Sequence, residues 1–136
     1  MPNKDIVANR GFVQFLGTGA GDCVELHAGE CNEGNCARAK ELGGRNLRHA
    51  PSLLISPDVL VDFYSDVQMH TYGIADESIH HLLITHTHYD HFQPTSILDF
   101  ASRLSHPLNV YGSVNVENAL DFAAAYRWDE SAGNFE

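Results

Sequence analysis

The chain has 136 residues, of which 43% are hydrophobic and 19% are charged, and this is the composition of an ordinary globular protein. A chain of this length can bury a real core, so we expect a single domain over residues 1–136. No apolar stretch approaches the ~20 residues that cross a bilayer, and residues 1–5 lack the apolar core of a signal peptide. We therefore expect no membrane association and a cytoplasmic location.

The net charge of −10 is unevenly placed along the chain. Residues 1–50 carry six basic and six acidic side chains, whereas residues 51–136 carry two basic and twelve acidic ones. Because an acidic surface repels the phosphates of nucleic acids, general nucleic-acid binding is disfavoured. Bound divalent cations would offset part of this charge locally, so a small anionic substrate is compatible with the composition.

Residues 11–16 are apolar and β-prone, and they predict a first strand. The strand runs into a glycine-rich turn, residues 17–21, whose backbone can bend sharply and approach a ligand closely. The turn is not a dinucleotide-binding fingerprint, because Asp22 stands where glycine is needed and no helical pattern follows. A plain tight turn and a turn that borders a functional site are both open.

Three cysteines, Cys23, Cys31 and Cys36, lie in a long irregular stretch, residues 22–50. In a chain without a secretion signal, an odd cluster indicates thiols or metal ligands before disulfides. The spacing C-x7-C-x4-C is looser than a paired CxxC knuckle, so a structural zinc and three unconnected thiols are both open. A short helix is expected near residues 36–42, where two glycines follow.

Residues 52–56 and 59–62 flank Pro57-Asp58 and predict a hairpin. Asp62 closes the second strand of this hairpin. Its carboxylate can orient a metal-bound imidazole from behind, or it can cap the segment that follows; we favour the first role. A short helix is expected from residue 66 to residue 72, ended by Gly73.

The next strand, residues 80–85, leads directly into the most informative segment of the chain, HTHYDH at residues 86–91. His86 and His88 are two apart in extended backbone and therefore point to the same side. Asp90 and His91 follow where the chain turns, so they can reach a point a few ångströms further on. Histidine-rich loops are often only solvated, but four ligand-type residues after a buried strand favour metal binding. The arrangement suits two adjacent ions better than one.

Beyond the motif, Pro94 starts an amphipathic helix whose inward face holds apolar residues. Residues 108–111 predict a short strand, and residues 115–126 predict a last helix. Strand and helix alternate after residue 80, which indicates an α/β layer.

His86-x-His88-x-Asp90-His91 after an apolar strand resembles the signature of the metallo-β-lactamase superfamily. The turn at residues 16–19 is similar to the opening turn of the RNase Z-like and phosphodiesterase branches, and residues 59–62 resemble the strand that carries the family's aspartate. Residues 31 and 36–39 resemble the cysteine-rich insert of a cyclic phosphodiesterase, in which three cysteines and a distant histidine hold a structural zinc.

This resemblance implies an α/β fold with a mixed sheet and flanking helices, the first half of an αββα metallo-β-lactamase sandwich. It also implies two divalent ions, usually zinc, with manganese or iron as alternatives. His86 and His88 would hold one ion, and Asp90 and His91 the other. A hydroxide bridging the ions would attack a small, cyclic phosphodiester, and Asp90 would also orient the nucleophile or serve the leaving group.

The residues also depart from the family's pattern. A full member supplies a third histidine, a bridging aspartate and a last histidine from a second half, whereas only His106 follows the motif here, and it comes too early in the order. We therefore expect the N-terminal half of a hydrolase, which alone holds metal weakly and is nearly inactive, with an apolar sheet face left uncovered.

Two alternatives to the phosphodiesterase remain open. One is a lactonase or thioesterase on the same fold, because a fold does not choose its substrate. The other is a non-catalytic module that acts by association, either as a homodimer or with a complementary second chain.

Overall fold

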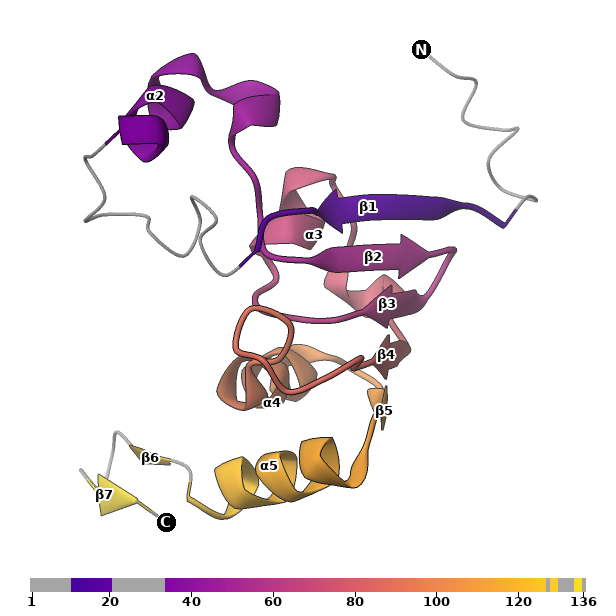
Figure 1. The fold of residues 1–136 in the computed structure, drawn as a ribbon. Helices are drawn as coiled ribbons and strands as arrows, with labels where there is room; N and C mark the ends of the chain where they lie inside the picture. Colours follow the sequence, from indigo (N-terminus) through magenta and orange to yellow (C-terminus); the bar gives the residue numbers. More distant parts are fainter. Residues whose placement is uncertain (1–10, 21–33, 127, 130–133, 136) are drawn as a thin grey trace.

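The structure is a computed structural model that describes residues 11–20, 34–126, 128–129 and 134–135 (Figure 1). The strands are β1 (Val13–Gly17), β2 (Ser52–Ile55), β3 (Val59–Val61), β4 (His81–Leu83), β5 (Asn109–Tyr111), β6 (Trp128–Asp129) and β7 (Asn134–Phe135). The helices are α2 (Gly34–Leu42), α3 (Val67–Thr71), α4 (Pro94–Arg103) and α5 (Val114–Ala125), with single 3-10 turns η1 (Gly44–Asn46) and η2 (Asp76–Ser78). In these ranges no helix has the length and apolar character needed to cross a bilayer.

Five strands form one mixed sheet in the order β1-β2-β3-β4-β5. The hairpin strands pair antiparallel with each other and with β1, whereas β3, β4 and β5 pair parallel. It follows that β1, β3, β4 and β5 all run in one direction, so their C-terminal ends lie at the same end of the sheet (Figure 1). We call this the carboxyl end of the sheet. The predicted α/β class and mixed sheet are confirmed.

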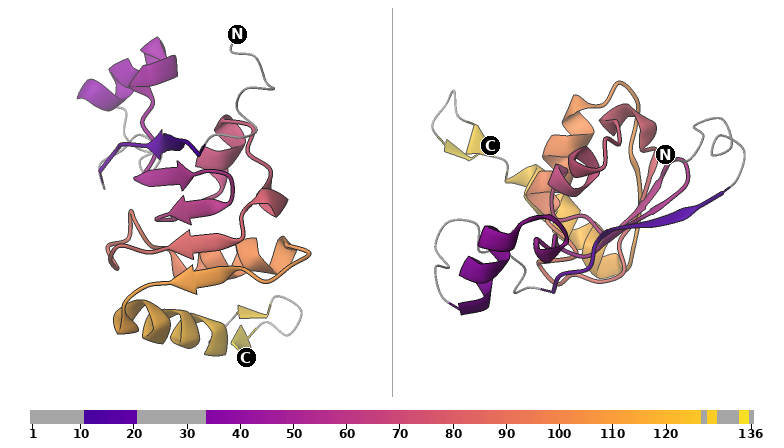
Figure 2. Two further views of the ribbon diagram at one scale, coloured as in Figure 1. Left: turned by 90° about the vertical axis from the view of Figure 1, so that its right-hand side faces the viewer. Right: turned by 90° about the horizontal axis from the view of Figure 1, so that it is seen from above.

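The core lies between one face of the sheet and the helices α3 and α4, which Figure 2 shows on the same side. Alternate strand residues point to this side, and Leu54, Leu60 and Leu82, which are neighbours in register, are almost fully buried. From the helices, Met69, Ile97 and Phe100 pack against them. The amphipathic pattern after Pro94 therefore buries the face that the sequence predicted.

The other face of the sheet has no helix over it in the described part of the chain (Figure 2). One row of side chains crosses all five strands in register, and its members are Phe15, Leu53, Val61, Leu83 and Tyr111. The neighbouring row consists of Val13, Ile55, Val59, His81 and Asn109. We call these ten residues the open face; they include no Lys, Arg, Asp or Glu, and Phe15 is 67% exposed. The predicted uncovered apolar face is confirmed.

Most elements lie where the sequence placed them, with small differences at their ends. The helix expected at residues 36–42 begins two residues earlier, and Gly43 and Gly44 end it with positive φ angles of 62° and 55°, which glycine adopts at little cost. The strand expected at residues 80–85 is paired only over His81–Leu83. The two-residue strands β6 and β7 were not predicted, because two residues carry no periodicity.

His106 lies at the opposite end of the sheet from the carboxyl end, just before β5. Its ring stacks on His80 with a centroid distance of 3.9 Å, and its two nitrogens face the carbonyl oxygens of Pro107 at 3.1 Å and Glu77 at 3.2 Å. The hydrogen bond to the Pro107 carbonyl, followed by that to the Glu77 carbonyl and by the Glu77 charge, raises the pKa of His106. Ser105 holds the pKa of the Glu77 carboxyl below its usual range.

We predict a pH-dependent contribution of His106 to stability. Only the protonated ring can donate to both carbonyls, and a raised pKa gives stability that is complete at low pH and is lost as the pH rises through the folded-state pKa. The stability difference between the wild type and His106→Gln, measured by urea unfolding, should shrink as the pH rises from about 6 to about 8. A difference that stays constant or grows over this range would contradict the prediction.

Candidate metal centre

The motif lies on the loop that leaves β4 at the carboxyl end of the sheet. The backbone turns tightly there, since the N–H groups of His91 and Phe92 both donate to the carbonyl of His88, at 3.0 and 2.9 Å. The same loop is tied to the segment that follows β3, because the Phe63 N–H donates to the His91 carbonyl at 2.9 Å and the Phe63 carbonyl accepts from the Gln93 N–H at 3.1 Å. Phe63 and Phe92 are buried. These two buried side chains therefore anchor the loop that carries the four polar residues of the motif.

The four predicted ligands form two pairs of donor atoms. Nε2 of His86 lies 3.1 Å from Nδ1 of His88, and Nε2 of His91 lies 3.6 Å from Oδ2 of Asp90. The pairs are adjacent, because the ring centroids of His86 and His91 are 4.1 Å apart. The structure therefore places the four side chains close together on the loop after β4, and their assignment to two ions stays a prediction.

Asp62 lies behind this group at the end of β3, where it is almost fully buried. Its carboxylate accepts from the Thr85 N–H at 2.8 Å, from the Thr85 hydroxyl at 2.8–2.9 Å, and from Nδ1–H of His91 at 2.7 Å. With Nδ1 donating, Nε2 of His91 is left with its lone pair toward Asp90. This is the orienting geometry expected behind a metal-binding imidazole.

The backbone of Asp62 is itself unusual, with a φ of 59°. Aspartate tolerates this left-handed conformation better than most residues. Two hydrogen bonds hold it, from the Asp62 N–H to the Leu83 carbonyl at 2.8 Å and from the Ser52 hydroxyl to the Asp62 carbonyl at 3.0 Å. The hairpin and β4 thus fix the direction of the carboxylate. The alternative role for Asp62, a cap for the segment that follows, is not what the structure shows, because the N-cap position of α3 is occupied by Asp66.

The donor pairs can be compared with the geometry of a bound ion. Two ligands about 2.0–2.1 Å from one tetrahedral zinc lie about 3.3 Å apart, which is close to the separations within both pairs. Among the described residues, however, no third histidine, cysteine, aspartate or glutamate atom joins either pair to make a group within 4.8 Å. Each pair therefore has the separation that two ligands of one ion would have, and an ion held there would need further ligands to complete its shell.

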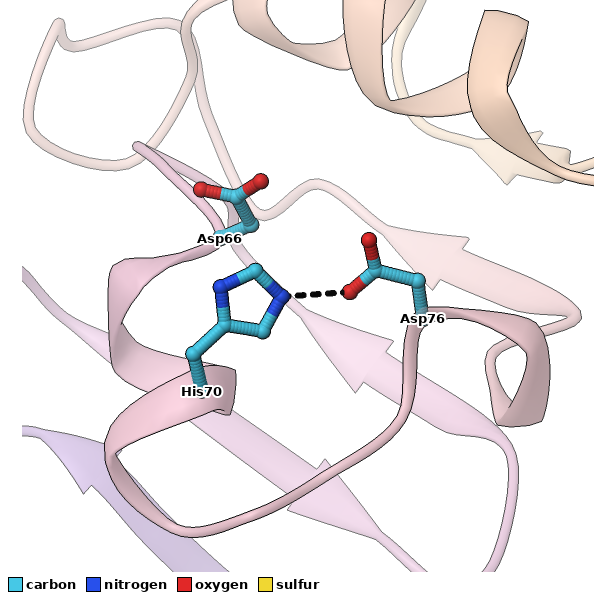
Figure 3. A group of neighbouring side chains, drawn as sticks. All are labelled: Asp66, His70 and Asp76. Atoms are coloured by element: carbon cyan, nitrogen blue, oxygen red, sulfur yellow. Dashed lines mark hydrogen bonds and ion pairs between the residues drawn. The ribbon is translucent and has the colours of Figure 1, made fainter.

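A second group of ligand-type residues lies on the helix side of the sheet (Figure 3). Asp66, His70 and Asp76 place one ligand atom each within 4.8 Å of one another, and Nε2 of His70 lies 2.7 Å from Asp76. Arg103 already provides a cation here, since its guanidinium binds Asp66 and lies 3.9 Å from Asp76. The hydrogen bond to Asp66 raises the pKa of Arg103. We interpret this group as an ionic link between α3, η2 and α4.

The remaining predicted residues are placed as follows. Cys23 and Cys31 lie outside the described residues, and Cys36 lies in the first turn of α2, so the structural zinc stays a prediction. The turn after β1 reaches the carboxyl end of the sheet, where Gly19 donates to the His49 carbonyl at 2.8 Å. A Cβ on Gly17 would lie 1.8 Å from the Ala50 oxygen. Close packing of two backbones is thus one reason for glycine there.

Nothing in the sequence singled out Thr85 as a site residue, because it is only the last residue of the apolar run before the motif. In the structure its N–H and hydroxyl both bind Asp62, and its oxygen lies 3.0 Å from Nδ1 of His86. A hydroxyl residue between an apolar strand and a histidine motif was the available signal. Its significance depends on the position of Asp62, which is 23 residues away in the sequence.

The sheet order and the placement of the helices define a mixed five-stranded α/β fold with the motif loop at the carboxyl end of the sheet. The chain is similar in structure to human tRNase Z, short form (ELAC1), with a TM-score of 0.54 and 20% sequence identity. The alignment covers 82% of this chain and 38% of that chain. No family model and no curated protein matches the sequence. At this identity the likeness establishes the fold, and activity is a separate question.

We predict that Asp62→Asn destabilises the chain by about 1.5–3 kcal/mol, because hydrogen bonds to a charged acceptor are lost in a buried place. Asparagine also tolerates a positive φ, so the loss reports the carboxylate and not the backbone. Asp99→Asn is the matched control; that side chain is 63% exposed and should change stability by less than about 0.5 kcal/mol. Equal effects of the two substitutions in urea unfolding would refute the prediction.

Proposed function

We propose that the chain is the metal-binding half of a metal-dependent hydrolase, most simply a phosphodiesterase. The observation that carries the proposal is the pairing of donor atoms at 3.1 and 3.6 Å in front of a buried carboxylate. Two divalent ions, when bound, polarise the bond under attack and activate a water molecule near neutral pH. The similarity to a tRNase supports a phosphodiester as the substrate class.

The residues of this chain take separate roles in the proposal. His86 and His88 hold one ion, and Asp90 and His91 hold the other. Asp62 keeps the His91 ring in place and leaves its Nε2 available. Asp90 is 8% exposed, and its carboxylate also orients the attacking water or passes a proton to the leaving oxygen.

Charge supports a small substrate over a long nucleic acid. Residues 51–136 carry twelve acidic and two basic side chains, so the repulsion of an extended polyanion is not offset by a basic surface. A small cyclic phosphodiester places little charge near the sheet, and that charge lies at the ions. A lactone or thioester is the runner-up, and side-by-side turnover of bis(p-nitrophenyl) phosphate and an acyl lactone separates the two.

We predict weak zinc binding that depends on the motif. With two protein ligands per ion in place of four, the binding free energy should be about half that of a structural zinc site, which corresponds to a Kd of roughly 1–200 µM. Calorimetric titration should be done with Cys23, Cys31 and Cys36 replaced by serine, so that thiols do not compete. His88→Ala should remove the binding, and turnover of the phosphodiester should be close to background.

The control is His70→Ala, which removes the ligand-type histidine of the Asp66 group and should leave the titration unchanged. Zinc binding that survives His88→Ala and disappears in His70→Ala would place the ion in the wrong site for the proposal. Tight binding of two ions with brisk turnover would show that the motif needs no further ligands.

We further propose that a second copy of the chain covers the open face. Its ten side chains offer an apolar surface on the order of 600 Å² per copy, which gives a total close to the lower limit for stable dimers. Sheets pack face to face about 10 Å apart through such rows. A second sheet on the open face would also bring new side chains toward the two donor pairs. If the chain has no catalytic activity, this association is the alternative function that we propose for it.

We predict a concentration-dependent dimer, measured by sedimentation velocity between about 5 and 200 µM, a range that suits an interface of this size. Phe15→Glu, at the edge of the open face, should shift the protein to monomer, because a carboxylate would be buried against apolar side chains. Phe122→Glu is the matched control, since Phe122 is a phenylalanine of similar exposure, 66%, that lies on α5 and is not one of the ten open-face residues. If the wild type is still a monomer at the highest concentration, the dimer proposal is wrong, and a different chain becomes the candidate partner for the open face.

A further inference from the structure

The hydroxyl of Thr85 lies between Asp62 and His86. Its oxygen is 2.8–2.9 Å from both carboxylate oxygens of Asp62 and 3.0 Å from Nδ1 of His86. A hydroxyl has one proton to donate and lone pairs that accept, whereas an ionised carboxylate can only accept. The Thr85 proton must therefore point to Asp62.

This assignment fixes the hydrogen bond on the other side of the hydroxyl. With its proton used, the Thr85 oxygen can only accept from His86, so Nδ1 of His86 carries the ring proton. Nε2 then holds the lone pair, and Nε2 is the atom that lies 3.1 Å from His88 in the first donor pair. A metal ligand must present such a lone pair.

The geometry points to Thr85 as a positioning residue that selects the metal-binding tautomer of His86. We propose that Asp62 thereby sets one imidazole in each donor pair, His91 through a direct hydrogen bond and His86 through the Thr85 hydroxyl. The inference rests on the proposed metal site for its purpose, but the tautomer itself is a property of the metal-free chain. It extends the role of Asp62 from one ion to both.

The second histidine of the pair is not fixed in this way. In the metal-free chain Nδ1 of His88 donates to Nε2 of His86, because His86 can only accept there. His86 and His88 are both exposed, and the hydroxyl of Thr85 fixes the ring proton of His86, whereas the ring proton of His88 can move to Nε2 through solvent. The pair therefore combines one preset ligand with one that adapts.

The test is a long-range ¹H–¹⁵N correlation spectrum of the metal-free, ¹⁵N-labelled chain at about pH 8, where an ordinary imidazole is neutral. In the wild type, Nε2 of His86 should give the signal of an unprotonated nitrogen. In Thr85→Val, which keeps the shape and loses the hydroxyl, the His86 signals should move toward a mixture of both tautomers. Thr85→Ser should restore the wild-type pattern.

The matched control is Thr87→Val, because Thr87 is the threonine on the other side of His86 and its side chain is exposed. It should leave the His86 signals unchanged. In zinc titrations, Thr85→Val should weaken binding about tenfold or more, in line with other residues that orient metal ligands, whereas Thr85→Ser and Thr87→Val should stay near the wild-type value.

A wild-type spectrum with the proton of His86 on Nε2 would overturn the inference, and this spectrum decides even if Thr85→Val fails to fold. A folded Thr85→Val chain with unchanged His86 signals would overturn it as well. Absence of zinc binding by the wild type would count against the proposed function alone, because the tautomer is read without metal.

Discussion

The carboxylate of Asp62 is the interaction on which the candidate site depends. It stands at the end of β3 in a backbone conformation held by β2 and β4, and it receives hydrogen bonds from the residue before the motif and from the last residue of the motif. The two ends of the histidine loop are thereby fixed to one point. The aligned C-terminal ends of the parallel strands explain why this point and the loop meet.

The two faces of the same sheet differ in what covers them. Helices α3 and α4 pack on one face of the sheet, whereas the open face exposes rows of mostly apolar side chains to solvent. The donor pairs have two ligands each within the described residues, and the solved structure with the same fold has a longer chain, of which 38% aligns. Under the proposed function, a sheet packed on the open face would both cover these apolar side chains and bring further ligands to the donor pairs.

Much of this could be predicted from the sequence. The apolar run before residue 86 and the two-residue spacing of His86 and His88 predicted two histidines on one side of an extended segment, and their nitrogens are 3.1 Å apart. Alternation in residues 52–62 predicted the hairpin and the place of Asp62. Local patterns of this kind need only the period of a strand and the chemistry of a turn.

What could not be predicted depends on contacts between distant segments. Thr85 gained its role only when β3 and β4 paired and brought Asp62 beside it. Arg103 binds Asp66 and lies close to Asp76, although nothing in the sequence indicates that these three residues meet. Gly17 proved to be constrained by the Ala50 backbone, 33 residues later, which no local pattern records.

The central claim is that the motif, and not the Asp66 group, is where this chain holds divalent ions. The most direct measurement is residue-resolved paramagnetic broadening of amide signals by Co²⁺, added in small amounts to the ¹⁵N-labelled chain without cysteines. The account predicts that broadening is strongest at residues 86–91 and at Asp62. Broadening centred on Asp66, His70 and Asp76, with the motif signals unaffected, would contradict it.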